Sequence, residues 1–368
     1  MNDQPVEISL VISDLGSGGA QRVLTNLAHA WTAAGRRVCV ITLASPESDF
    51  FPLDPTIRRI GIGGLKTSSN LLSALLTNWK RICGLRSALR ESGAPIAVSF
   101  VGTTNILTVL ASVGLNIRIV ISERNDPAIQ SLGFVWDILR RVFYRFADVV
   151  TANSRGALKP LSTFVPQHKL AYVPNLLTAP PMEEIQILPE PAILAVGRLH
   201  PQKAYDVLLD AFAEIAPRFQ DWRLAILGDG PLKETLHQQA ERLNLSSSID
   251  WLGRAANPFP FYRSSKIFVM PSRYEGTPNA LLEAMSCGLP VVVSDASPGP
   301  LEYVEHEVSG LVVPVNNSKA LADAILRIIS DSELRRRLGA AARERVAECD
   351  PGKGLSIWEK VVGLIAEP

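Results

Sequence analysis

Glu275 and Glu283 are separated by seven residues, and a helix is expected to begin between them, over residues 278–287. Thr277 can cap this helix, and Pro278 suits its first position because a missing N–H costs nothing there. The start of a helix presents unpaired backbone N–H groups and the positive end of a dipole, which suit phosphate. Because carboxylates repel phosphate, the two glutamates are better suited to neutral hydroxyls, such as those of a sugar or a ribose. The alternative is an ordinary turn with two surface glutamates.

Two cations, Arg198 and Lys203, follow an earlier strand that is expected over residues 192–196. Both should project from the carboxyl end of that strand toward the start of the helix. Two cations and a set of helix N–H groups are suited to stabilising the charge that develops on a departing diphosphate. Each charge-assisted hydrogen bond contributes about 1.5–3 kcal/mol, so several together could replace a divalent metal ion. A surface salt bridge is the alternative role for this pair.

The residue types that bind metals are scattered along the chain. The five histidines form no H-x-H or H-x-x-x-H pattern, and the four cysteines contain no C-x-x-C pair. The sequence therefore predicts no zinc site and no metal cofactor. Dispersed cysteines are also typical of a reducing compartment, so we expect a cytoplasmic location.

Length and charge limit the possible functions. A chain of 368 residues is long enough for two domains with separate cores. The net charge of +1 argues against nucleic acid as a partner, because such binding relies on overall or clustered basicity. The first residues are polar, unlike a signal peptide, and no apolar run approaches the roughly 20 residues that a membrane-spanning helix needs. Peripheral attachment to the inner face of a membrane stays open.

The first half of the chain opens with a strand, a glycine-rich turn, a helix and a second strand, which predicts a parallel βαβ unit. Gln21 stands where the third glycine of a dinucleotide-binding turn is required, and the second strand ends without an acidic residue to hold a ribose. A nicotinamide-dependent enzyme is therefore disfavoured. Gly18 and Gly19 could still let backbone N–H groups approach an anion, or they could form a tight turn without a ligand.

Three further buried strands are expected over residues 96–100, 117–122 and 149–152. The loop after the second lies at the carboxyl end of its strand, where open α/β sheets bind ligands. An ordinary polar loop is the alternative to an acceptor or sugar site. The candidate residues in this loop are Glu123, Arg124 and Asn125.

Two expected helices in this half, over residues 79–90 and 137–146, are amphipathic and basic. Such helices can lie on an anionic membrane surface or bind a phosphate-bearing acceptor, although a solvated face over the core is the more ordinary role. Their basic residues are Lys80, Arg81, Arg86, Arg90, Arg140, Arg141 and Arg145.

A stretch rich in proline and acidic residues, over 178–191, predicts a linker with a boundary near residue 180. Beyond it the alternation of strands and helices begins again. We therefore expect an α/β protein with two Rossmann-like domains facing across a cleft, where a ligand would contact loops of both. The expected domains are 1–178, for the acceptor, and 190–352, for a nucleotide sugar, with residues 353–368 crossing back to the first.

Two turns of the second half are further candidates. Residues 228–231 read Gly-Asp-Gly-Pro, in which the glycines allow positive φ angles. Gly253 and Arg254 end a strand where a base could stack or pair with the backbone, whereas the neighbouring Trp251 is better explained as core.

In their order along the chain, these motifs resemble those of the retaining, metal-independent glycosyltransferases of the GT-B fold, family 4. This family is also called the glycosyl transferase group 1 family. The resemblance covers nearly the whole chain. It is looser for the members that add N-acetylgalactosamine to lipid-diphosphate-linked oligosaccharides. The segments that carry it are 16–22, 196–199 with Lys203, 228–231, 251–254 and 272–295.

The resemblance implies a role for each matching residue. Arg198 and Lys203 would hold the donor diphosphate, Glu275 would lie near the donor sugar, and Glu283 would bind the nucleotide ribose. The turn with Gly18 and Gly19 would close over the phosphates. The backbone cradle for phosphate would consist of Gly276, Thr277, Pro278, Asn279 and Ala280.

The implied reaction moves a sugar, such as N-acetylgalactosamine, from a UDP-sugar to a lipid-linked oligosaccharide or polysaccharide precursor, with retention and without a metal. Many members have a histidine near the donor sugar, whereas this chain has Glu123, Arg124 and Asn125 in that neighbourhood. A nucleotide-sugar epimerase on the same two-domain plan is one alternative. A sugar-nucleotide or lipid-surface binding protein without catalytic activity is another.

Overall fold

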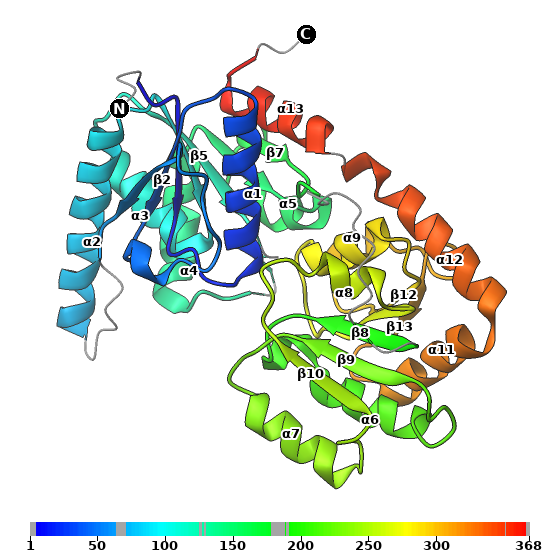
Figure 1. Cartoon of the computed structure of the whole chain (residues 1–368). Coiled ribbons are helices and arrows are strands. Elements are labelled where there is room, and N and C mark those ends of the chain that lie inside the picture. The colour runs from blue at the N-terminus through cyan, green and yellow to red at the C-terminus, as the bar shows by residue number, and fades with distance from the viewer. Residues whose placement is uncertain are drawn as a thin grey trace. The chain divides into compact units, whose positions relative to one another are not determined.

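The computed structural model describes residues 5–63, 71–124, 127–128, 130–177, 188, 191–349 and 351–365. The chain forms two compact units, Met1–Leu176 with Pro351–Pro368, and Leu177–Asp350. Each unit is a parallel β-sheet covered by helices on both faces (Figure 1), so the predicted pair of Rossmann-like domains is confirmed. The last helix, α13 (Pro351–Val362), belongs to the first unit.

The sheet of the first unit has seven strands in the order β3-β2-β1-β4-β5-β6-β7, all paired in parallel. The central strands β1, β2 and β4 are wholly buried, because helices cover both faces of a parallel sheet. The strands are β1 (Ile8–Ile12), β2 (Val38–Thr42), β3 (Arg58–Gly61), β4 (Ile96–Phe100), β5 (Arg118–Glu123), β6 (Val149–Ala152) and β7 (Leu170–Tyr172).

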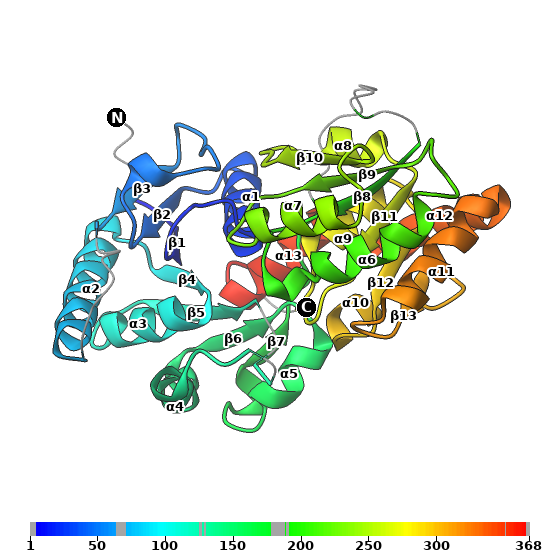
Figure 2. The same ribbon diagram turned by 90° about the horizontal axis from the view of Figure 1, so that it is seen from below.

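Two hydrophobic clusters hold this unit together, one on each face of the sheet. The helices α2 and α3 pack on one face, and α1 and α13 on the other (Figure 2). Trp358 of α13 lies with its ring centroid 6.2 Å from that of Trp31 and 5.9 Å from that of Phe100. The helices are α1 (Gly19–Ala33), α2 (Leu71–Ser92), α3 (Gly102–Ser112), α4 (Phe134–Phe143) and α5 (Arg155–Leu161), with short helices η1 (Pro46–Ser48), η2 (Tyr144–Phe146) and η3 (Gln167–Lys169).

The second unit has a six-stranded parallel sheet in the order β10-β9-β8-β11-β12-β13. The strands are β8 (Ala192–Val196), β9 (Arg223–Leu227), β10 (Ile249–Gly253), β11 (Ile267–Met270), β12 (Val291–Ser294) and β13 (Leu311–Val313). The helices are α6 (Tyr205–Ile215), α7 (Lys233–Arg242), α8 (Phe259–Arg263), α9 (Asn279–Ser286), α10 (Pro298–Leu301), α11 (Ser318–Ser330) and α12 (Ser332–Arg345), with short helices η4 (Pro201–Lys203) and η5 (Ala347–Cys349).

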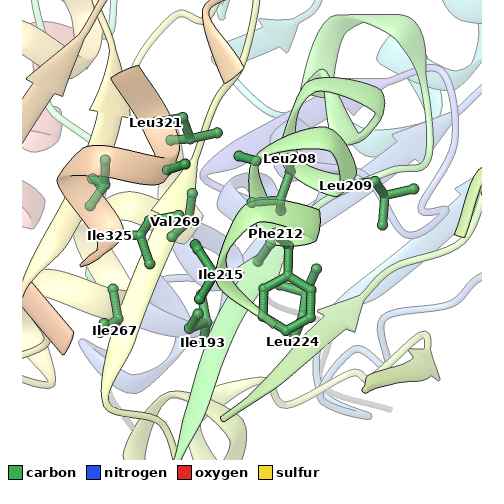
Figure 3. Packing of buried hydrophobic residues seen from close by; sticks show 14 of the residues in the cluster. Ile193, Leu208, Leu209, Phe212, Ile215, Leu224, Ile267, Val269, Leu321 and Ile325 are labelled. Atoms are coloured by element: carbon green, nitrogen blue, oxygen red, sulfur yellow. The ribbon is translucent and has the colours of Figure 1, made fainter. Parts of the chain in front are cut away.

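Spacing along α6 explains how one face of this sheet is covered. Leu208, Phe212 and Ile215 recur every three or four residues, so they form one apolar stripe. The stripe packs against strand residues such as Ile193 and Leu224 (Figure 3). Burial of this kind contributes roughly 25 cal/mol for each Å² of apolar surface. A rigid sheet is the result, and it fixes where the loops at its carboxyl ends begin.

In both sheets the strand order reverses direction at the first strand, between β1 and β4 and between β8 and β11. Open α/β sheets bind ligands at the carboxyl ends of the strands beside such a reversal. In the second unit, the loops after β8 and β11 begin at this point. They carry Lys203 and Glu275, respectively.

Candidate active site

Hydrogen bonds join the loop after β8 to the loop after β11. The Arg273 N–H donates to the carbonyl of Gln202 at 2.7 Å, and Gln202 Nε2 donates to the carbonyl of Tyr274 at 3.0 Å. The Arg273 guanidinium also bonds the carbonyl of Pro201 and the carboxylate of Asp206, each at 2.6 Å. The short helix η4 is therefore held against residues 273–275 by both backbone and side-chain bonds.

The Glu275 carboxylate lies at the centre of this junction and is 7% exposed. Its Oε1 accepts hydrogen bonds from Lys203 Nζ at 2.5 Å and from Ser272 Oγ at 2.8 Å, and its Oε2 accepts one from Gln202 Nε2 at 3.4 Å. A buried carboxylate without such partners would be strongly destabilising. The ion pair fixes the Lys203 ammonium at Glu275, in the loop that leads into α9, before any ligand arrives.

Close backbone packing, and not a positive φ angle, explains the glycines at residues 228–230. Glycines at these positions would allow positive φ, but neither Gly228 nor Gly230 adopts it. A Cβ atom on Gly228 would lie 1.9 Å from the carbonyl oxygen of Gly197. That carbonyl also accepts a hydrogen bond from Tyr205 Oη at 3.1 Å. Burial, with the Glu275 charge nearby, raises the pKa of Tyr205, so its hydroxyl stays protonated as a donor.

The helix that follows Glu275 begins one residue later than the sequence predicts. Asn279 is the first residue of α9 and Pro278 occupies the cap, without a side-chain cap bond, so the expected Thr277 cap is wrong. Pro278 has no N–H of its own, and its φ of −79° and ψ of 116° suit the cap position. Asn279 and Ala280 form the first turn of α9, and Gly276 and Thr277 precede it in the chain.

Glu283 lies one turn inside α9 and is 5% exposed. Its Oε2 accepts a hydrogen bond from Tyr262 Oη of α8 at 3.0 Å. The bond fixes the carboxylate between the two helices, and no sequence pattern indicates Tyr262 as its partner. Both predicted glutamates are thus buried and oriented by a hydrogen bond, which disfavours the alternative of two surface glutamates.

The other predicted donor residues of this unit are more exposed. Arg198 is exposed, and no other residue in the described part of the chain pairs with its guanidinium. Gly253 has a φ of +66°, and Arg254 forms a half-exposed ion pair with Asp229 at 3.3 Å. Trp251 packs against the core and stacks on His237, with ring centroids 4.2 Å apart, as expected for a core residue.

In the first unit, Gly18 caps α1 and Gly19 is its first residue. Asp14 organises the turn before them: its Oδ1 accepts hydrogen bonds from the Gly16 N–H at 2.8 Å and from Gln21 Nε2 at 3.1 Å. Gln21, which replaces the third glycine of the dinucleotide pattern, therefore stabilises the turn through its side chain.

Glu123 and Arg124 lie at the carboxyl end of β5, and both are buried. Tyr144 Oη donates to Glu123 Oε2 at 2.8 Å, while Arg124 bonds Asn175 and lies 5.5 Å from the ring centroid of Phe100. Burial and the Glu123 charge raise the pKa of Tyr144 well above its usual range, so the phenol remains a donor. Asn125 lies outside the described residues.

The predicted basic helices carry fewer surface cations than the sequence suggests. Arg140 is buried and bonds Asp137 at 2.9 Å, and Arg86 donates to the carbonyl of Ala111 at 2.9 Å. Arg141 and Arg145 remain exposed. A long side chain can reach a carbonyl or a carboxylate from a position that a helical projection places on the surface, which sequence spacing does not reveal.

The described residues contain neither a cluster of metal ligands nor a membrane-spanning helix. Within them, no three histidine, cysteine, aspartate or glutamate side chains are gathered as metal ligands. The described helices include none that is both long and apolar enough to cross a bilayer.

Two family models match adjoining parts of the chain. Residues 18–176 match the glycosyl transferase 4-like domain, and residues 183–345 match the glycosyl transferases group 1 model. The chain belongs to the group 1 glycosyltransferases.

Similar proteins include two N-acetylgalactosaminyltransferases of Campylobacter jejuni. One is 28% identical over 98% of this glycosyltransferase and 99% of its own length, and is named for GalNAc-α-(1→4)-GalNAc-α-(1→3)-diNAcBac-PP-undecaprenol. The other is 26% identical over 94% and 96%, and is named for N-acetylgalactosamine-N,N′-diacetylbacillosaminyl-diphospho-undecaprenol. The fold is shared with sucrose-phosphate synthase from Thermosynechococcus elongatus, at a TM-score of 0.81, 21% identity and coverage of 96% and 97% of the two chains.

Within the second unit of this glycosyltransferase, the structure thus pairs one ammonium group with a buried carboxylate in the loop before α9, and a second buried carboxylate lies one turn inside that helix. Sequence reasoning missed Gln202, Ser272 and Tyr262, which orient the charged groups. Gln202 and Ser272 lie within three residues of Lys203 and Glu275, respectively, so their place in the chain was a usable signal.

Proposed function

We propose that this glycosyltransferase moves an N-acetylhexosamine, with N-acetylgalactosamine as the first candidate, from a UDP-sugar to a lipid-diphosphate-linked oligosaccharide. We further propose that the transfer retains the anomeric configuration and needs no metal ion. The observation that carries the proposal is the Lys203–Glu275 ion pair, which holds a cation in the loop that leads into α9. The names of the two Campylobacter relatives support the choice of sugar and acceptor.

The donor would bind with its diphosphate against the amides that precede and begin α9, and with its ribose hydroxyls on Glu283. Lys203 and Arg198 would supply positive charge to the phosphate oxygens. A diphosphate competes for the Lys203 ammonium, so Glu275 would be released toward the hydroxyls of the donor sugar. Gly253, Arg254 and the turn with Gly18 and Gly19 remain candidates for further contacts with the base and the phosphates.

In the reaction, the bond from the anomeric carbon to the phosphate oxygen lengthens first and leaves an oxocarbenium-like sugar. Lys203, Arg198 and the helix N–H groups stabilise the negative charge that gathers on the diphosphate. The acceptor hydroxyl then attacks from the same face of the sugar, and its proton passes to a phosphate oxygen. A covalent sugar on Glu275 is disfavoured, since the same carboxylate would have to bind the hydroxyls of the donor sugar.

A screen of nucleotide sugars with a GalNAc-terminated lipid-diphosphate acceptor tests the proposal. We expect transfer from UDP-N-acetylgalactosamine and a product with the α configuration by NMR. Transfer from other nucleotide sugars alone, or a β-linked product, would contradict the proposed donor or stereochemistry. Conversion of the donor to a second sugar nucleotide in the absence of acceptor would favour the epimerase alternative.

Chelation of divalent cations should leave the activity unchanged. The described residues gather no set of metal ligands, and Lys203 would supply the positive charge that a metal ion otherwise provides. Initial rates are to be measured with and without EDTA, after removal of bound metals. A loss that Mn²⁺ or Mg²⁺ restores would show that the positive side chains are not sufficient.

The exposed face of α4 is one part of the first unit that is suited to an anionic membrane surface. Phe134 is 82% exposed and Val135 is 61% exposed, while Arg141 on the same helix and Arg145 in the following η2 provide positive charge. Apolar side chains beside surface cations favour the interface of an anionic bilayer. We therefore propose that the enzyme acts while bound peripherally to the membrane that carries its acceptor.

Binding to phosphatidylcholine vesicles that contain phosphatidylglycerol should fall as salt is raised, because salt screens the attraction between surface charges. The double substitution F134S and V135S should weaken this binding several-fold in a flotation assay. Val308, which is 48% exposed in the second unit, provides the matched control V308S. Vesicle binding that does not change with salt concentration, or that the double substitution F134S and V135S leaves intact, would contradict the proposed surface.

A further inference from the structure

Ser297 occupies the cap position of α10, is 4% exposed, and forms no side-chain capping bond to that helix. A serine at this position usually accepts a hydrogen bond from an N–H of the first helical turn. Its hydroxyl instead accepts a hydrogen bond from the Glu275 N–H at 2.9 Å and donates one to the Glu275 carbonyl at 2.7 Å. One side chain thus satisfies both backbone polar groups of the proposed catalytic glutamate.

The residues on either side of the turn that contains Ser297, at the end of β12 and in α10, contact the Glu275 loop at two more points. Ser294 Oγ donates a hydrogen bond to the carbonyl of Ser272. Gly299 approaches so closely that a Cβ on it would lie 1.9 Å from the carbonyl oxygen of Gly276. Residues 294–299 therefore line the backbone of residues 272–276 with two hydroxyls and a glycine.

The turn itself is tied to the neighbouring strand. The Asp295 N–H donates to the carbonyl of Val313 at 2.9 Å, and the Val315 N–H donates to Asp295 Oδ1 at 2.8 Å. Since β12 and β13 are paired in the sheet, these bonds hold the turn in a fixed position relative to the sheet. The turn can therefore support the less regular loop that carries Glu275.

We infer that Ser297 is a positioning residue for the transfer reaction, because its hydroxyl fixes the Glu275 backbone and so places both the carboxylate and the first amides of the phosphate cradle. This inference rests on the proposed function of that loop. Without the hydroxyl, a buried N–H and a buried carbonyl lose their partner, and the loop must move to find others. Small displacements of groups that hold a reacting substrate lower the rate strongly.

The substitution S297A tests the inference, and Ser309 provides a matched control. Ser309 is 2% exposed in the same unit, accepts a hydrogen bond from the Glu305 N–H at 3.0 Å and donates one to the Tyr303 carbonyl at 3.2 Å. S309A thus removes the same pair of bonds from a segment that carries no proposed donor residue. Both variants should lower the melting temperature to a similar extent.

Only S297A should change the kinetics, with kcat falling at least tenfold and the KM for the UDP-sugar rising. S297T keeps the hydroxyl and should recover most of kcat. Hydrogen exchange in a peptide spanning residues 272–280 should also become faster in S297A and not in S309A.

Equal kinetic effects of S297A and S309A would overturn the positioning role, as would unchanged exchange in S297A. A wild-type enzyme that uses no UDP-sugar would instead contradict the proposed donor, and the exchange measurement would still test Ser297.

Discussion

Replacing Lys203 with alanine should lower kcat/KM for the donor at least about 30-fold. One charge-assisted hydrogen bond contributes about 1.5–3 kcal/mol, and a loss of about 2 kcal/mol in transition-state stabilisation corresponds to that factor. The Lys203 ammonium is 18% exposed and already fixed by Glu275, so little order has to be imposed when the donor binds. The effect should appear mainly in kcat, since the charge on the leaving diphosphate grows in the transition state.

Stability has to be separated from catalysis in this variant. The substitution K203A leaves the buried Glu275 carboxylate without its cation, which is itself destabilising. Adding E275Q should restore the melting temperature, because a neutral amide leaves no buried charge, but it should not restore turnover. The control K319A removes a lysine that is 67% exposed and pairs with Glu214 and Asp323. A K203A enzyme with the turnover of K319A would exclude Lys203 from stabilisation of the leaving group.

The sheet strands and the two-domain fold could be predicted because buried parallel strands are short, almost continuous apolar runs. The runs at residues 96–100 and 192–196 match β4 and β8 in full. The edge strand β3 was not predicted. It contains Arg58 and Arg59 and is only partly buried, so its sequence lacks the apolar run that marks a central strand. Edge strands commonly carry charged side chains.

The candidate site was predictable at the level of loops and not at the level of contacts. Lys203 and Glu275 are far apart in sequence, but they follow neighbouring strands of one parallel sheet, and the order of the sheet brings their loops together. Ser297 carries no such signal, since a serine before Pro298 is expected to cap the helix that follows. Its bonds to Glu275 depend on how closely two turns approach, which only the packed structure defines.

Arg140 shows a related limit of sequence patterns. The spacing places it with Arg141 and Arg145 on a basic helix, yet its side chain is buried and bonds Asp137 one turn earlier. Glu123 and Arg124 were candidates for a sugar site, and the structure bonds both to buried partners such as Tyr144 and Asn175. Periodicity describes where a Cβ atom points, whereas the partner of a long polar side chain is decided by tertiary packing.

The substitution E283Q should weaken UDP binding by about tenfold to 150-fold, which corresponds to the loss of about 1.5–3 kcal/mol from a charge-assisted hydrogen bond to a ribose hydroxyl. The amide keeps the size of the side chain and can still accept the hydrogen bond from Tyr262 Oη, which limits the change in packing. Glu241, an exposed glutamate on α7, provides the control E241Q. Isothermal titration calorimetry measures the dissociation constants directly.

Ligands that lack one ribose hydroxyl separate recognition by Glu283 from a general disturbance of α9. The wild-type enzyme should bind 2′-deoxy-UDP or 3′-deoxy-UDP less tightly than UDP, because the carboxylate then faces no hydroxyl. In E283Q the same deletion should cost much less affinity, since the charged partner is already gone. If E283Q weakens UDP and both deoxy ligands by the same factor, Glu283 acts through packing against α8, and the ribose must be held by other residues.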